Sequence, residues 1–238
     1  MFEPLVLYSH GITPNPIKVA IILEELELPY ECKIIDMKTE LKAEPFISVN
    51  PNGRLPALED PNTGVKLFES GAIIEYLVAT YDKENKLHHT TSPEQWLEKS
   101  WLHFQMSGQG PYFGQRVWFM KYHPEVGRTT NPPLLGQIPL TKQKQKVPSA
   151  VERYGNEIKR VTGVIDAHLK KQGTPYLLGD NISYADLVWV PWQSFYPMFG
   201  FDDWDWKTEH PSFAAWNERL AERPAVKKVY AKEEFQMH

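Results

Sequence analysis

The sequence predicts an α/β domain followed by a domain built only of helices. Strand-like and helix-like patterns alternate up to Tyr81, and from Pro93 onward apolar residues recur only at helical spacing. The polar stretch between these two regions indicates a linker. We therefore expect domains at residues 1–84 and 93–238, joined by residues 85–92.

The first domain contains short apolar runs typical of buried strands and two segments with one apolar helical face. The order is strand, helix, strand, two adjacent strands and a helix, which indicates a compact α/β unit. The predicted strands are Leu5–Tyr8, Tyr30–Ile35, Leu55–Leu58 and Val65–Phe68, and the predicted helices are Pro16–Glu27 and Gly71–Tyr81. Between them, Lys38–Glu44 fits either a charged loop or a short helix.

The first helical segment of the second domain contains residues that disrupt helices. Gly108, Gly110 and Pro111 are expected to kink or break it before it resumes over Tyr112–Tyr122. The next segment, His123–Pro148, is rich in proline and has no periodicity, so we expect a long loop that is either mobile and functional or a passive surface insertion.

Two Ser-x-x-acid patterns predict helix starts with capping boxes. The first pairs Ser149 with Glu152 ahead of a long helix, and the second pairs Ser183 with Asp186. Because the Asp186 carboxylate is expected to cap its helix, we assign it a structural role and no role in catalysis.

Composition limits the classes of function. The net charge of -4 gives no reason to expect nucleic acid or an anionic membrane as a partner, and no apolar run is long enough to span a bilayer. The single cysteine, Cys32, excludes an internal disulfide framework and a C-x-x-C motif, and the N-terminus lacks the features of a signal peptide. We expect a cytoplasmic protein without a metal site.

Two neighbouring segments predict a site for a short peptide. Leu55 precedes Pro56 and is therefore extended, which leaves its backbone N–H and C=O free to pair with a peptide backbone. Ser70 is predicted to be the N-cap of the next helix, whose N-terminus suits a carboxylate. Glu69 beside it suits an ammonium group, so one turn can hold both ends of an α-amino acid.

This combination resembles the glutathione S-transferase family. The matching runs are Arg54-Leu55-Pro56-Ala57-Leu58 and Phe68-Glu69-Ser70-Gly71-Ala72-Ile73. The resemblance covers nearly the whole chain and implies a thioredoxin-like N-terminal domain with an all-helical C-terminal domain. It also implies that the first run pairs with the cysteinyl backbone of glutathione and that the second run binds its γ-glutamyl end.

The first loop indicates the branch of the family. Its Thr13-Pro14-Asn15 run resembles the bacterial nu class and the fungal transferases related to the yeast nitrogen-regulation prion protein. Cys32 lies in the second predicted strand, away from this loop, which excludes the cysteine-type classes. In that branch the arginine matching Arg153 lies near the glutathione thiol, and the Ser149–Tyr154 run supports the match.

The glutathione thiol needs activation, because an unperturbed thiol titrates near ~8.5. We expect Asn15 to be the main donor to the sulfur, assisted by Thr13, with the helix N-terminus adding a smaller effect. The alternatives are Tyr8, Ser9 and Arg153.

One position departs from the family pattern. Leu41 stands where relatives often carry a polar residue that contacts glutathione, and the neighbouring Lys42 is the candidate replacement. The expected glutathione-binding residues are thus Asn15, Lys42, Arg54, Leu55, Pro56, Glu69, Ser70 and Arg153.

Two classes of function stay open. The first is an enzyme that uses glutathione against a small hydrophobic electrophile, a disulfide or a peroxide. The second is a non-catalytic glutathione-binding regulatory protein like the yeast relative. The sequence favours the enzyme, because that relative carries a long polar extension whereas strand-forming residues begin here at Leu5. The family also implies a homodimer.

Overall fold

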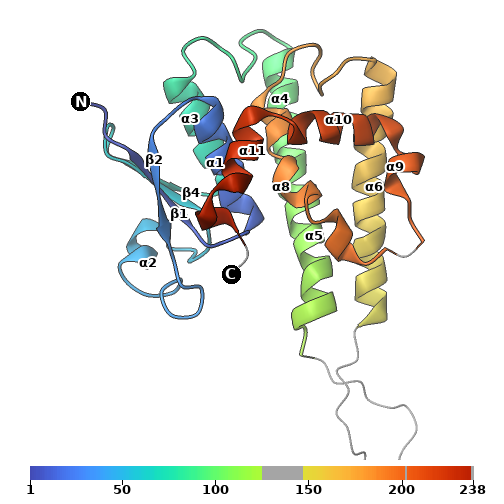
Figure 1. The fold of residues 1–238 in the computed structure, drawn as a ribbon, viewed down its shortest axis with the longest axis horizontal. Helices are drawn as coiled ribbons and strands as arrows, with labels where there is room; N and C mark the ends of the chain where they lie inside the picture. The colour runs from blue at the N-terminus through green and yellow to red at the C-terminus, as the bar shows by residue number, and fades with distance from the viewer. Residues whose placement is uncertain (125–146, 202, 237–238) are drawn as a thin grey trace, which may run out of the picture.

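The computed structural model describes residues 1–124, 147–201 and 203–236. A small sheet with helices forms the N-terminal half, and a set of helices forms the C-terminal half beside it (Figure 1). This confirms the predicted architecture of an α/β domain followed by an all-helical domain. The predicted loop over His123–Pro148 falls mostly on residues 125–146, which lie outside the described residues.

A four-stranded mixed sheet organises the N-terminal domain. Its strands β1 (Leu5–Ser9), β2 (Tyr30–Ile34), β3 (Ala57–Asp60) and β4 (Val65–Phe68) lie in the order β2-β1-β3-β4. β1 runs parallel to β2 and antiparallel to β3, which is antiparallel to β4. β3 begins two residues later than predicted, because the ladder starts only after Pro56, which has no N–H to donate.

Three helices complete this domain: α1 (Pro14–Glu25), α2 (Phe46–Val49) and α3 (Ser70–Tyr81). α1 and α3 pack against each other and bury apolar side chains such as Ile21 and Leu77 completely. The prediction that α1 starts at Pro16 is wrong by two residues. Pro14 occupies the first helical position, which its fixed φ favours. Lys38–Glu44 forms turns, and the short helix α2 follows it.

Of the predicted kink or break at Gly108, Gly110 and Pro111, the break does not occur, because the chain stays helical through them and changes to π-helical geometry. α4 (Glu94–Phe104) passes into the π-helical segment η1 (Gln105–Gln109), then α5 (Gly110–Val117) and a second π-helical segment, η2 (Trp118–Tyr122). The wider turn of η1 ends two residues before Pro111, in the turn where a residue without a backbone N–H leaves a carbonyl unpaired.

The remaining helices run from the middle of the chain back to the N-terminal domain. They are α6 (Pro148–Gln172), α7 (Tyr184–Leu187), α8 (Val190–Gln193), η3 (Tyr196–Phe199), α9 (Trp206–Glu209), α10 (Pro211–Ala221), α11 (Pro224–Ala231) and η4 (Glu233–Phe235). α11 packs against α1, so the end of the chain lies against its beginning (Figure 1).

One of the two predicted capping boxes is present. Ser183 Oγ accepts from the N–H of Ala185, and the Asp186 carboxylate accepts from the N–H of Ser183. Asp186 also accepts from the Trp216 indole at 2.9 Å, which confirms its structural role. The box at Ser149 is wrong: α6 begins at Pro148 and its N-cap is Val147, without a side-chain cap.

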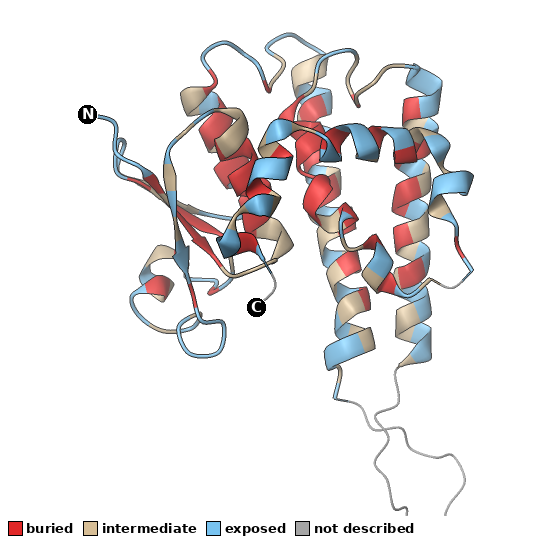
Figure 2. Cartoon of the chain, viewed as in Figure 1, coloured by how far each residue is buried: buried red, intermediate tan, exposed pale blue. Residues whose placement is uncertain are grey.

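The main buried core runs through both domains, and a smaller cluster of Tyr8, Ile35, Phe46 and Ala57 lies apart from it. Figure 2 shows buried residues along α1, α3 and the inward side of α6. Within the described ranges, no helix is long and apolar enough to cross a membrane.

Candidate active site

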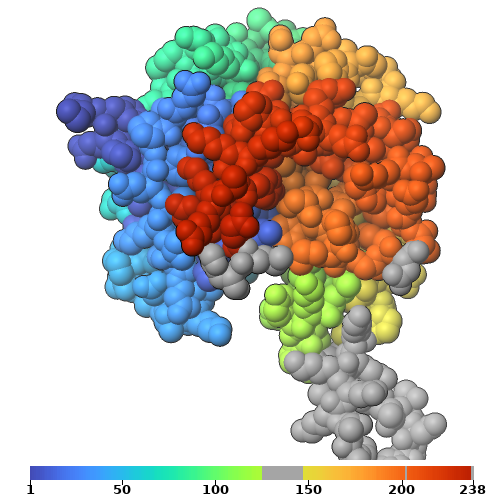
Figure 3. All heavy atoms as spheres, viewed as in Figure 1, coloured from blue at the N-terminus to red at the C-terminus, as the bar shows by residue number. Residues whose placement is uncertain are grey.

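The strand register brings the three predicted site segments to one end of the sheet. Tyr8 at the end of β1 pairs with Ala57 at the start of β3, which pairs with Phe68 at the end of β4. The loop after β1, the Leu55-Pro56 dipeptide and the turn at Glu69 therefore lie side by side. In Figure 3 the surface is notched between the N-terminal domain and the green end of the helical domain.

Leu55 has the free backbone groups that the sequence predicts. The Leu55–Pro56 peptide bond is cis, and the N–H and C=O of Leu55 have no hydrogen-bond partner among the described residues. The turn before it is held by Asn50, which is buried and whose Nδ2 donates to the Arg54 carbonyl at 2.6 Å. Leu55 is therefore a fixed, open pairing position for an incoming peptide.

The turn at Glu69 differs from the prediction in one respect. The N-cap of α3 is Glu69 rather than Ser70, which is the first residue of the helix. Glu69 has a φ of 70°, which is uncommon for a residue with a side chain and typical of functional sites. Its carboxylate is exposed, whereas Ser70 is buried and its Oγ lies 3.5 Å from Met106 Sδ.

Asn15 lies in the first turn of α1, not before the helix. Pro14 and Pro16 flank it and have no N–H, so Asn15 supplies a backbone donor as well as a side-chain amide at this end. Asn15 Oδ1 accepts from the Trp192 indole N–H at 3.2 Å. Asn15 Nδ2 has no partner among the described residues and can donate to a ligand.

Thr13 is the N-cap of α1, and its hydroxyl is engaged. Thr13 Oγ1 donates to the His10 carbonyl at 2.7 Å. Serving as a donor to sulfur would require this bond to break, so Asn15 is the better-placed group.

Tyr8 is occupied elsewhere in the sheet. Its hydroxyl donates to Glu59 Oε1, and burial together with this carboxylate holds the pKa of Tyr8 well above its usual value. Ser9 is fully buried and its Oγ has no partner among the described residues. Burial also raises the pKa of the Cys32 thiol to about 12, which makes it a poor nucleophile.

The three basic residues predicted for the site, Lys42, Arg54 and Arg153, lie on separate segments. Lys42 Nζ donates to the Asn52 carbonyl at 2.6 Å, which places its ammonium beside the turn that leads to Arg54. Arg54 is exposed. Arg153 is exposed on α6, and the structure shows no hydrogen bond or ion pair between it and any described residue.

A buried polar network behind the site has no counterpart in the sequence analysis. Lys18 is 1% exposed, and its ammonium donates to Gln105 Oε1 at 2.7 Å and lies 3.7 Å from Met106 Sδ. Burial lowers the pKa of Lys18 to about 7, against an opposing effect of the Glu69 charge. The only signal of this network in the sequence is that Lys18 is a charged residue within the apolar run of the first helix.

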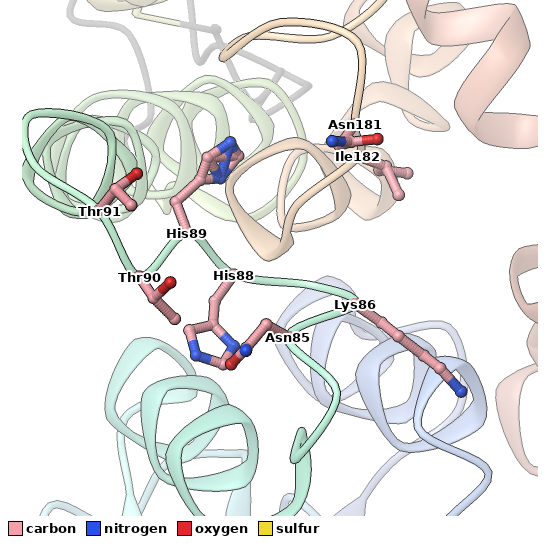
Figure 4. A pocket seen from close by; sticks show the side chains of 8 residues that line it. All are labelled: Asn85, Lys86, His88, His89, Thr90, Thr91, Asn181 and Ile182. Atoms are coloured by element: carbon pink, nitrogen blue, oxygen red, sulfur yellow. The ribbon is translucent and has the colours of Figure 1, made fainter.

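A separate cavity of about 440 Å³ lies at the linker between the domains. Figure 4 shows the side chains that line it: Asn85, Lys86, His88, His89, Thr90, Thr91, Asn181 and Ile182. It contains none of the predicted site residues, so the candidate active site stays at the end of the sheet where those residues lie. No cluster of three or more side chains suited to bind a metal occurs in the described part of the chain.

Comparisons with known proteins identify the family of this chain. The fold joins a thioredoxin-like sheet to a helical domain, and Leu55, whose backbone groups are unpaired among the described residues, lies beside the N-terminus of α3. This arrangement is typical of the glutathione transferase class of proteins. Residues 3–79 match the family described as glutathione S-transferase, N-terminal domain, and residues 135–233 match glutathione S-transferase, C-terminal domain. This chain belongs to the glutathione S-transferase family.

Individual relatives are similar over nearly their full length. The chain is 49% identical to the glutathione S-transferase-like protein OpS6 of Beauveria bassiana, covering 96% of this chain and 95% of that protein. Among solved structures, the glutathione transferase URE2P6 of Phanerochaete chrysosporium in complex with oxidized glutathione has a TM-score of 0.81 and 42% identity, covering 96% and 95%. Ure2p in complex with glutathione has a TM-score of 0.81 and 34% identity, covering 96% and 99%.

Proposed function

We propose that this protein is an enzyme that binds glutathione and activates its thiol. The proposal rests on one observation: the free backbone of Leu55 lies beside the N-terminus of α3 and the amide of Asn15 at one end of the sheet. These three groups suit a tripeptide whose backbone pairs with Leu55, whose free α-amino acid end binds at α3 and whose thiol lies at Asn15. The similarity to structures that contain glutathione supports the same ligand.

Each part of glutathione has a proposed partner. The γ-glutamyl ammonium pairs with Glu69, and the neighbouring carboxylate binds the N-terminus of α3 at Ser70. The cysteinyl backbone pairs with Leu55, held by Pro56. Lys42 and Arg54 supply positive charge for the carboxylate at the glycine end.

Asn15 is the proposed main donor to the sulfur, with Thr13 and Arg153 in supporting roles. Lowering a thiol pKa by about two units requires ~2.7 kcal/mol of preferential stabilisation of the thiolate. The Asn15 amide N–H₂ and its backbone N–H, at a helix N-terminus, are donors that stabilise the anion. The thiolate then attacks an electrophilic carbon, the leaving group departs with the bonding electrons, and the thiol proton goes to solvent.

The same thiolate can instead attack a disulfide or a peroxide, and these reactions stay within the proposal. The small hydrophobic electrophile or disulfide would bind in the helical domain. We further propose a cytoplasmic homodimer, as is typical of this family.

A non-catalytic regulatory role is the second candidate. The observation that favours it is 35% identity to Protein URE2 of Candida albicans, over 95% of this chain and 70% of that protein. A protein in this role would bind glutathione without turning it over.

A parallel assay separates these candidates. The purified protein is incubated with glutathione and either a chlorodinitrobenzene-type electrophile or a mixed disulfide, and glutathione binding is measured by titration calorimetry. We expect binding and turnover of at least one substrate. Binding without turnover of either would favour the regulatory role, and absence of binding would reject both candidates.

A further inference from the structure

The indole of Trp192 reaches across the domain boundary to the residue that we place at the thiol. Trp192 lies in α8 of the helical domain, and its Nε1 donates to Asn15 Oδ1 in α1 at 3.2 Å. The two residues are 177 positions apart, so only the packing of the two domains creates this contact.

This contact determines which way the Asn15 amide faces. The two ends of an amide differ, because the oxygen only accepts hydrogen bonds and the nitrogen only donates. The indole N–H has no acceptor atom, so it can face the amide oxygen but not the amide nitrogen. With Oδ1 held by Trp192, Nδ2 is left on the other side of the amide, and it has no partner among the described residues.

The surrounding helices fix the position of the indole. α5 presents glycine at the two positions that face it: a Cβ on Gly114 would lie 3.3 Å from Trp192 Cη2, and one on Gly110 would lie 3.5 Å from Nε1. The ring also packs edge-on against Phe113, at 6.4 Å between centroids. The indole is therefore held between α5 and α1 and is not a freely rotating surface side chain.

We propose that Trp192 is a positioning residue that holds the Asn15 amide with its N–H₂ toward the glutathione sulfur. This inference rests on the proposed role of Asn15 in thiol activation. Without the indole, the amide can rotate by half a turn and present its oxygen to the sulfur, and an oxygen destabilises a thiolate. Trp192 need not touch glutathione to have this effect.

The contact is expected to change the ionisation of the thiol but not the binding of the rest of the tripeptide. The residues proposed for the γ-glutamyl and cysteinyl backbone groups lie just before β3 and at the N-terminus of α3, and the structure shows no hydrogen bond between them and Trp192. The nearest charged residue along α1, Lys18, bonds to Gln105 and is unchanged in every variant below. A general structural defect would instead weaken binding of all glutathione derivatives.

The test is Trp192→Phe, which keeps an aromatic ring and removes the N–H. Thiolate absorbance of bound glutathione is followed against pH in the wild type, Trp192→Phe, Asn15→Ala and the double variant. Affinity for S-methylglutathione, which has no thiol, is measured by titration calorimetry. Trp101→Phe is the matched control, because it also removes a half-buried indole from the helical domain.

We expect Trp192→Phe to raise the apparent pKa of the bound thiol by roughly half a unit to one unit, the scale of one neutral hydrogen bond. In Trp192→Phe, the affinity for S-methylglutathione should change by less than about twofold, a small change in binding free energy. The double variant should match Asn15→Ala, because Trp192 acts only through the amide. Trp101→Phe should leave the thiol pKa unchanged.

Two results would overturn the inference in distinguishable ways. If Asn15→Ala raises the thiol pKa and Trp192→Phe does not, or if the two effects add, Trp192 has no positioning role and the proposed function stands. If Asn15→Ala itself leaves the thiol pKa unchanged, the proposed role of Asn15 fails as well. Should Trp192→Phe fold poorly, Gly114→Ala serves instead: its Cβ would lie 3.3 Å from Trp192 Cη2 and shift the indole by a few tenths of an ångström, which should lengthen the bond to Asn15 and raise the thiol pKa less than Trp192→Phe does.

Discussion

At the scale of single residues, Glu69 combines an exposed carboxylate with a backbone conformation that few glutamates adopt. We expect Glu69→Ala to weaken glutathione binding by roughly tenfold or more, because a charged hydrogen bond contributes about 1.5–3 kcal/mol. Titration calorimetry with glutathione measures the change.

Glu27→Ala is the matched control for this variant, because Glu27 is also exposed and has a positive φ of 54°. It lies at the other end of α1, so its replacement should leave glutathione affinity unchanged. Equal affinities for Glu69→Ala and the wild type would reject the assignment of the ammonium to Glu69.

Lys18 is a buried base whose ionisation should be visible in stability. Its pKa is lowered from 10.5 to about 7 in the fold. Between these values the unfolded chain binds a proton that the folded chain does not, so this group makes stability rise as pH increases through that window. The slope from one proton is at most about 1.4 kcal/mol per pH unit.

We expect Lys18→Met to remove this rise in the free energy of unfolding between pH 7 and about 8.5, a range in which tyrosine stays protonated in both states. Urea denaturation at several pH values measures the slope. Lys83→Met, at an exposed lysine, should keep the wild-type slope. Identical slopes in Lys18→Met and the wild type would show that Lys18 is charged in the fold.

At the scale of elements, α11 is attached to α1 by ion pairs that cross the domain boundary. Arg223 Nε and Nη2 donate to the two carboxylate oxygens of Glu25 at 2.5 and 2.7 Å, and the Glu25 side chain is only 9% exposed. Lys228 and Lys232 both pair with Glu24. α11 and the residues flanking it thus stabilise the position of α1, which carries Asn15.

We expect Arg223→Ala to lower the free energy of unfolding by about 2 kcal/mol, since a paired and partly buried guanidinium is lost. Thermal or urea unfolding measures this change. Lys227→Ala removes an exposed ion pair to Glu222 on the same segment and should cost less than about 1 kcal/mol. Similar losses from both variants would mean that the bidentate pair contributes no more than a surface contact.

At the scale of the whole molecule, exposed apolar side chains occur where the two domains meet. Trp96 and Leu97 of α4 are 58% and 47% exposed. One turn beyond Trp96, Lys99 pairs with Glu75 of α3 at 2.7 Å, so α4 lies against the N-terminal domain here. This face is our candidate for the homodimer interface.

We expect light scattering to give twice the chain mass of 27.6 kDa at micromolar concentration. Trp96→Glu should shift the protein toward the monomer, because an unpaired charge would be buried in the interface. Trp118→Glu, at an indole that is 47% exposed on η2, is the control and should remain dimeric. A wild-type mass near that of one chain would refute the dimer.

The sequence by itself determined the elements whose signals are local. Apolar runs and helical periodicity located the sheet strands and most helices, and the Ser183 capping box was correct because both partners lie within one turn. The predicted capping box at Ser149 was wrong because α6 already starts at Pro148, so Ser149 and Glu152 both lie inside the helix. The Ser-x-x-Glu pattern alone does not distinguish a helix start from the first turn of a helix that begins with proline. The Leu55-Pro56 and Glu69-Ser70 runs were recognisable because each makes its part of the candidate site within a few residues.

The tertiary structure alone decided how these parts meet. The register from Tyr8 through Ala57 to Phe68 brings the site segments together. Lys18 meets Gln105 across 87 positions of sequence, and Asn15 meets Trp192 across 177. Such contacts leave no periodic or short-range pattern, because they depend on the packing of two domains, and hydrogen-bond geometry is satisfied only once that packing is complete.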